Sequence, residues 1–199
     1  MTLADVTLKA TTQLLLGTYG NNLEEDERVM AFLMKNFDCP GIHLRRALSD
    51  MALALACAIL HKKTGRRKCN AFRRKMLKVL QKCHKKKAPI TMAPYLLLAA
   101  EAMADMPRRR SWDDIQQAYL KAVEVSRQCG GFIFVEAFGY EKLAKPAETR
   151  SDGPKTQFYL HEVSATCTRW GVKVKTIESK ERLAVLQSRY RFMSMTPGT

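Results

Sequence analysis

The strongest chemical signal in the sequence is a run of Lys and Arg residues between His61 and Lys87. This stretch holds 13 Lys or Arg residues and no Asp or Glu, so it carries 13 of the formal net charge of +15. A basic helix face can neutralise several phosphates and release their counterions, as nucleic-acid-binding proteins do. The candidate residues for binding a polyanion or an acidic partner are Lys62, Lys63, Arg66, Arg67, Lys68, Arg73, Arg74, Lys75, Lys78, Lys82, Lys85, Lys86 and Lys87.

Three other interpretations of this basic stretch remain open. An amphipathic basic segment can bind an anionic membrane, or it can hold an acidic protein partner. The charges can also form a solvated outer helix face that has no ligand. Proteins that bind single-stranded nucleic acid add aromatic side chains that stack on the bases, but here only Phe72 is present, and it falls on an apolar stripe.

The remaining reactive side chains form no recognisable catalytic or metal-binding pattern. The four histidines offer one candidate metal-ligand pair, Cys83 with His84, and adjacent helical residues point about 100° apart. Glu136 and Glu141 are five residues apart, off one helix face, which makes a poor acid and base pair. The sequence also lacks the Gly-rich phosphate loops and the kinase catalytic-loop pattern. We therefore expect no enzyme activity, no cofactor and no metal.

Cysteine spacing and hydropathy indicate an intracellular protein without a membrane span. The six cysteines are scattered and include no Cys-x-x-Cys pair, which is typical of reduced thiols. Residues 1–20 lack a basic start and contain Asp5, which argues against a secretory signal. The longest apolar run, Met51 to Leu60, has about half of the ~20 residues that a membrane span needs. We expect the protein in the cytoplasm or the nucleus.

Helix-breaking residues divide the chain at regular intervals. From Pro40 onward they recur roughly every 18 to 24 residues, which leaves segments long enough for about four or five helical turns. The connecting loops are short, so neighbouring helices must run antiparallel. The breakers are residues 38–41, Thr64-Gly65, Ala88-Pro89, Met106-Pro107, Gly130-Gly131, residues 151–154 and Gly171.

Two of these segments have clear and contrasting faces. Residues 69–86 place apolar side chains at three- and four-residue spacing, which predicts an outer helix with one apolar stripe and a basic remainder. That stripe consists of Phe72, Met76, Val79, Leu80 and Cys83. Residues 43–62 are apolar on every side and rich in alanine, which predicts a helix buried between its neighbours.

The second half of the chain predicts four more helices. Ser111 is a predicted N-cap for a helix over residues 111–129, and Asp114 gives that helix an acidic start. Helices over residues 132–150 and 155–170 follow, and Gly171 is expected to end the latter in a left-handed conformation. The last helix, over residues 174–192, is expected to act as a terminal cap with a polar outer face. Its apolar positions are Ile177, Leu183, Leu186 and Tyr190.

The spacing of these elements predicts the fold class. Helix pairs recur with a period of about 40 residues, which is typical of helical-repeat proteins. We therefore predict an all-α protein made of stacked antiparallel helical hairpins, a tetratricopeptide-like α-solenoid. Residues 1–40 are expected to form a degenerate N-terminal helical segment, and residues 41–199 the repeat array with its C-terminal capping helix.

Several motifs resemble a known family. Tyr119 to Ala144 looks like a tetratricopeptide-type helix pair. Residues from about 51 to 190 resemble the helical repeat region that follows the ATPase module in large multidomain signalling ATPases and sensor kinases of microbes and algae. The similar segments are residues 64–67, Tyr95 to Glu101, Glu136 to Ala144, Tyr159 to Lys175 and Arg182 to Tyr190.

This resemblance, together with the missing ATPase and kinase motifs, predicts a module that binds rather than catalyses. The first hypothesis is a protein-protein interaction or scaffold module within a signalling assembly, whose partner is unknown. The alternative is a module that binds nucleic acid or an anionic surface through the basic helix 62–87.

Overall fold

The computed structural model describes residues 44–86, 88–105, 110–129 and 132–195, together with Glu24 and Arg28. For residues 44–49 and 189–195 only the backbone is described. Between Leu44 and Met195 the described residues form seven α-helices and no strand, which confirms the predicted all-α class. The chain divides into two compact units, Met1–Arg110 and Ser111–Thr199.

The predicted N-terminal helical segment over residues 1–40 lies outside the described residues, with two exceptions. Glu24 and Arg28 both have helical backbone and form an ion pair one turn apart. The predicted helix end at Gly130 and the candidate residue Lys87 also lie outside the described part of the chain.

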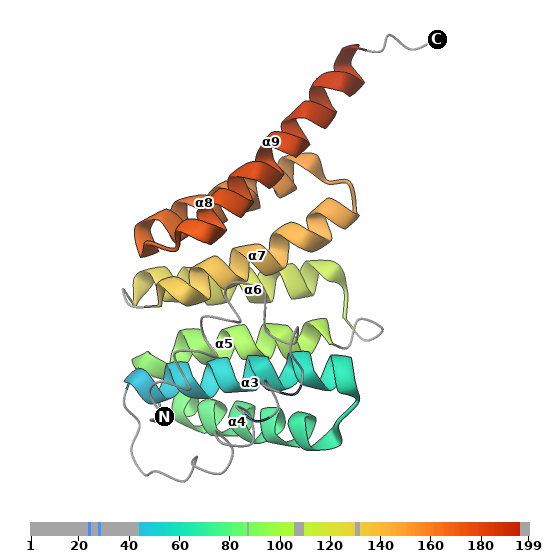
Figure 1. Ribbon diagram of the computed structural model, residues 1–199. Helices are drawn as coiled ribbons and strands as arrows, with labels where there is room; N and C mark the ends of the chain where they lie inside the picture. The colour runs from blue at the N-terminus through green and yellow to red at the C-terminus, as the bar shows by residue number, and fades with distance from the viewer. Residues whose placement is uncertain are drawn as a thin grey trace. The chain divides into compact units, whose positions relative to one another are not determined.

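The first unit contains α3 (Leu44–Thr64), α4 (Arg67–Lys85) and α5 (Pro89–Ala104), and each of these helices packs against the other two (Figure 1). Every side chain from Asp50 to Ala58 is buried, which confirms the prediction of a helix enclosed by its neighbours. The predicted apolar stripe of α4 also faces the core, because its central residues Met76 and Leu80 are buried.

The second unit contains α6 (Trp112–Gln128), α7 (Ile133–Thr149), α8 (Gly153–Trp170) and α9 (Lys173–Met195). Each helix packs against the next one in the chain, and successive helices run in opposite directions (Figure 1). Since α7 packs against both α6 and α8, every side chain from Phe134 to Tyr140 is buried.

Local signals define the ends of these helices. The hydroxyl of Ser111 accepts a hydrogen bond from the Asp114 backbone N–H, and the Asp114 carboxylate accepts one from the Ser111 N–H. This reciprocal capping box confirms the predicted start of α6. At the end of α8, Gly171 has a φ of 81°, so the predicted left-handed end of this helix is also confirmed.

Aromatic side chains and one glycine join the helices of the second unit. The Arg150 guanidinium lies 4.6 Å from the ring centre of Trp112, and Trp170 contacts Phe134 edge-on at 5.8 Å. Gly139 allows α7 to approach α6 closely, because a Cβ at this position would lie 2.7 Å from Val123 Cγ2.

The structure corrects one feature of the predicted capping helix. Ile177 is not part of the buried face of α9, because it is 57% exposed. Val174 and Val185, on the same helix, are exposed to a similar degree. Lys175 is buried instead, at 4% exposure. The outer face of α9 is therefore partly apolar rather than wholly polar. No described helix is long and apolar enough to cross a membrane.

Candidate functional site

The structure places most of the predicted basic residues on the surface of the first unit. Of the 13 candidates, Arg73 is half-buried and Lys87 lies outside the described residues. The other candidates are exposed, namely Lys62, Lys63, Arg66, Arg67, Lys68, Arg74, Lys75, Lys78, Lys82, Lys85 and Lys86.

Two of the candidates have a structural role. Lys62 at the end of α3 and Arg73 on α4 both pair with Asp105, the residue that follows α5. Burial alone would raise the pKa of Asp105, but the hydrogen bonds from Lys62 and Arg73 outweigh it and hold the pKa below its usual value. This cluster ties the three helices together, and in it Lys62 and Arg73 already have an acidic partner.

Seven exposed cations lie together on the outside of α4 and pair with no acidic side chain among the described residues. At about 100° per residue they fall within an arc of roughly 120°, opposite the buried stripe. Lys62 and Arg73, which pair with Asp105, are not among these seven. We call these seven the α4 basic face: Arg67, Lys68, Arg74, Lys78, Lys82, Lys85 and Lys86.

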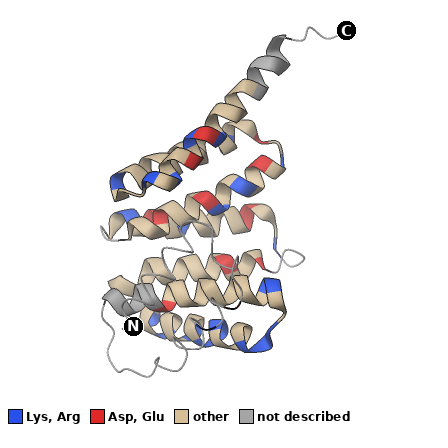
Figure 2. Cartoon of the chain, viewed as in Figure 1, with Lys and Arg blue, Asp and Glu red and all other residues tan. Residues whose placement is uncertain are grey.

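The exposed side chains of α4 are almost all cationic. The exposed positions of α4 that are not Lys or Arg are Ala71 and Gln81. No large apolar side chain of α4 is exposed, and Phe72 is half-buried against the core. Figure 2 shows the Lys and Arg residues gathered on α4 and at the end of α3, whereas the sequence of α5 contains none.

A second candidate site is a cleft in the second unit. It lies where the C-terminal ends of α6 and α8 meet the N-terminal end of α7, and its volume is about 660 Å³. Apolar and charged side chains share its walls. The lining residues are Arg127, Phe132, Ile133, Glu136, Glu162, Ala165, Thr166 and Arg169.

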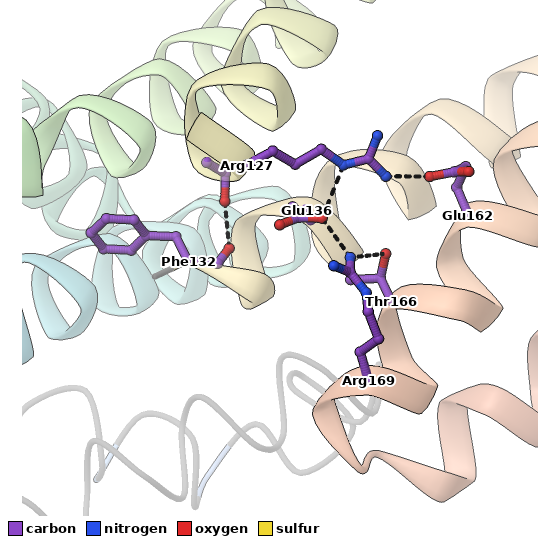
Figure 3. A network of polar contacts seen from close by, with 7 residues as sticks. Arg127, Phe132, Glu136, Glu162, Thr166 and Arg169 are labelled. Carbon is purple, nitrogen blue, oxygen red and sulfur yellow. Dashed lines mark hydrogen bonds and ion pairs between the residues drawn. The ribbon is translucent and has the colours of Figure 1, made fainter. Parts of the chain in front are cut away.

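Glu136 is the centre of a polar network in this cleft (Figure 3). Its side chain is only 7% exposed, and its Oε2 accepts hydrogen bonds from Arg127 Nε at 3.2 Å and from Arg169 Nη2 at 2.8 Å. Arg169 also contacts the Thr166 hydroxyl at 3.4 Å. One buried carboxylate therefore fixes the positions of two guanidinium groups that come from different helices.

The two arginines keep binding capacity at the surface. Their side chains are 45% and 55% exposed, for Arg127 and Arg169 respectively. Each guanidinium carries five N–H donors, and the contacts with Glu136, Glu162 and Thr166 use only some of them. Arg127 also lies over the ring of Tyr140, whose burial raises its pKa to about 12.

Sequence reasoning missed this cleft. Glu136 was considered only with Glu141, and the structure separates the two, because Glu141 pairs with the buried Lys175 at 2.8 Å. A signal was available, since Glu136 lies within the apolar run Phe132 to Phe138, and a carboxylate buried in such a run needs a cationic partner. The partners themselves are 9 and 33 residues away, and the sequence around them does not identify them as partners of Glu136.

Two buried thiols, Cys57 and Cys167, lie in surroundings that disfavour the thiolate form. Burial, the largest effect on each, raises the pKa of Cys57 far above its usual value and that of Cys167 to about 11. Such thiols are poor nucleophiles at neutral pH. Within the described ranges no three His, Cys, Asp or Glu side chains gather in a way that could hold a metal ion.

Comparison with known proteins adds no family assignment. No protein-family model, no curated protein and no solved structure matches this chain. The cleft and the α4 basic face are therefore the features from which a function can be inferred.

Proposed function

We propose that this chain is a non-catalytic helical-repeat module that binds a protein partner, and that the cleft between α6, α7 and α8 is where it does so. The cleft carries the proposal because it combines an apolar wall with two arginines that are held in place. Arg is enriched among the residues that dominate protein-protein binding energy, and apolar surface beside it supplies the desolvated contact. Its volume of about 660 Å³ lies within the range of ligand pockets.

The buried carboxylate makes this site suitable for recognition. An arginine side chain that is free in solution loses conformational entropy when a partner fixes it, and that loss weakens binding. Here Glu136 already holds Arg127 and Arg169 before any partner arrives. The planar guanidinium groups can then offer their remaining N–H donors to backbone carbonyls or carboxylates of a bound segment.

The charge balance of the cleft favours a protein segment of mixed polarity. Arg127 and Arg169 are matched there by Glu136 and Glu162, so the walls carry no net charge. A ligand must therefore be held by directed hydrogen bonds and apolar contact rather than by bulk attraction. A peptide segment has both carbonyl acceptors and apolar side chains.

The proposed setting is a signalling or regulatory assembly in the cytoplasm or the nucleus. The order of motifs that resembles the repeat region of multidomain signalling ATPases and sensor kinases supports this setting, as does the sequential packing of α6 to α9. The described cysteines are all free thiols, which suits a reducing compartment.

The proposal can be tested by affinity capture with a variant that fills the cleft. Ala165 is exposed and lines the cleft, so Ala165→Trp blocks it without disturbing the core. Ala184→Trp adds the same side chain at an exposed position of α9, outside the cleft, and is the matched control. We expect cell extract to yield a protein that is retained by the wild type and by Ala184→Trp and is lost with Ala165→Trp.

Two results would contradict the proposal. One is that the wild-type chain retains no protein above background. The other is that every captured protein is retained equally by the wild type and by Ala165→Trp.

A further inference from the structure

The α4 basic face allows an inference that goes beyond the protein-binding function and does not depend on it. We propose that this face binds the phosphate backbone of double-stranded nucleic acid, without regard to base sequence. The proposal starts from the seven exposed cations and from the absence of an acidic partner for them among the described residues.

The charges of this face are spread along the whole length of α4. From Arg67 to Lys85 the helix rises about 27 Å, and Arg67, Arg74, Lys78, Lys82 and Lys85 follow each other at intervals of about 5 to 10 Å. A strand of duplex DNA carries one negative charge per ~3.4 Å of helix axis. A strand winds around the duplex axis while α4 is straight, so the cations of α4 can meet phosphates of the two strands that border one groove.

The α4 basic face has no large apolar side chain that could anchor a partner. Stable protein-protein contacts depend on a few large, desolvated side chains near their centre, such as Trp and Tyr, or Arg packed beside apolar surface. An amphipathic helix that enters a membrane surface likewise needs Trp, Phe or Leu on the side that faces the lipid. The exposed positions of α4 outside the basic residues are Ala71 and Gln81, which serve neither purpose.

The side chains of α4 favour duplex over single-stranded nucleic acid. Proteins that bind single strands place aromatic rings on the surface so that unpaired bases can stack on them. Phe72, the one aromatic residue of α4, is half-buried on the side of the core stripe. A face that offers only cations matches the outside of a duplex, where phosphates are exposed and the bases are stacked on each other.

The closing experiment measures fluorescence anisotropy of a labelled 24-base-pair duplex of mixed sequence with the full chain, at NaCl concentrations from 50 to 200 mM. If five to seven phosphates are contacted, log K should fall against log salt with a slope of about −4 to −6. A second duplex of unrelated sequence should bind with the same affinity. A single strand of equal length should bind more weakly.

The test variant replaces five cations of the α4 basic face with glutamine: Arg67→Gln, Arg74→Gln, Lys78→Gln, Lys82→Gln and Lys85→Gln. The control variant removes five exposed lysines of the second unit: Lys121→Gln, Lys145→Gln, Lys155→Gln, Lys173→Gln and Lys180→Gln. Both variants lose the same net charge, and all ten side chains are exposed, so both should keep the far-UV circular dichroism of the wild type. We expect the α4 variant to lose at least tenfold in affinity and about four units of salt slope, while the control changes little.

Several results would overturn the inference. One is that the wild type fails to bind the duplex at 50 mM NaCl. Another is that the control variant loses as much affinity as the α4 variant. Tighter binding to vesicles of phosphatidylserine and phosphatidylcholine, or to polyglutamate, would instead assign the face to a membrane or to an acidic protein. The single substitution Lys78→Glu, at the middle of the face, gives an independent check and should weaken duplex binding severalfold.

Discussion

Arg169 on α8 donates a hydrogen bond of 2.8 Å to the carboxylate of Glu136 on α7, and this contact connects residues 33 positions apart. Because Arg127 of α6 donates to the same oxygen, Glu136 joins three successive helices at the cleft. The carboxylate is buried while both arginines reach the surface. The network therefore stabilises the second unit and also positions the groups proposed to contact a partner.

Glu136→Gln should destabilise the second unit by about 2 kcal/mol, because two guanidinium groups lose their charged acceptor at a buried position. The matched control is Glu162→Gln, whose side chain is 27% exposed and pairs with Arg127, and it should cost under about 1 kcal/mol. Urea unfolding followed by the fluorescence of Trp112 and Trp170 measures both, since both tryptophans lie in the second unit. Equal losses in the two variants would contradict this role of Glu136.

Gly139→Ala should destabilise the second unit by about 1 kcal/mol, although alanine forms helices better than glycine. The new Cβ would meet Val123 Cγ2 at 2.7 Å, and the β-branched, buried Val123 cannot move aside cheaply. In a Val123→Ala background the contact is gone, so the same substitution should become stabilising. Urea unfolding measures the change in the free energy of unfolding in each background. If Gly139→Ala changes it with the same sign in both, the two helices do not approach closely at this position.

Asp105 should make the stability of the first unit depend on pH. Its pKa is lower in the folded chain than in the unfolded chain, where it is about 3.9. The stabilisation from Lys62 and Arg73 is therefore present above that value and is lost as the pH falls through the folded pKa. Asp105→Asn should be less stable than the wild type by about 2 kcal/mol at pH 7, and the difference should shrink below about pH 4. Urea unfolding followed by circular dichroism from pH 7 to pH 2.5 measures this, and a difference that stays constant would argue against the cluster.

Ser111→Ala should remove one half of the capping box at the start of α6 and destabilise the second unit by about 1 kcal/mol. Ser111→Asp keeps a side-chain oxygen for the Asp114 N–H and should retain most of that stability. Thermal unfolding followed by Trp fluorescence compares the three proteins. If Ser111→Asp loses as much as Ser111→Ala, the side-chain acceptor is not what stabilises this end.

Features that depend on neighbouring residues were predictable from the sequence, and features that depend on tertiary contact were not. Ser111 with Asp114, Gly171 and the apolar stripe of α4 all act within one or two helical turns, so composition and spacing reveal them. The phase of α9 was misjudged at Ile177, because the burial of Lys175 depends on Glu141, which lies 34 residues earlier. The contacts of Arg127, Glu136 and Arg169 likewise arise only when three helices pack.

The most direct test of the proposed binding site is hydrogen exchange followed by mass spectrometry, on the chain alone and with a partner captured by the wild type. The proposal predicts that the partner slows exchange in residues 127–129 and 132–136 and in residues 162–169, which form the walls of the cleft. The Ala165→Trp variant should show no such protection at the same partner concentration. Protection confined to α9 or to the first unit, with none in these segments, would contradict the proposal.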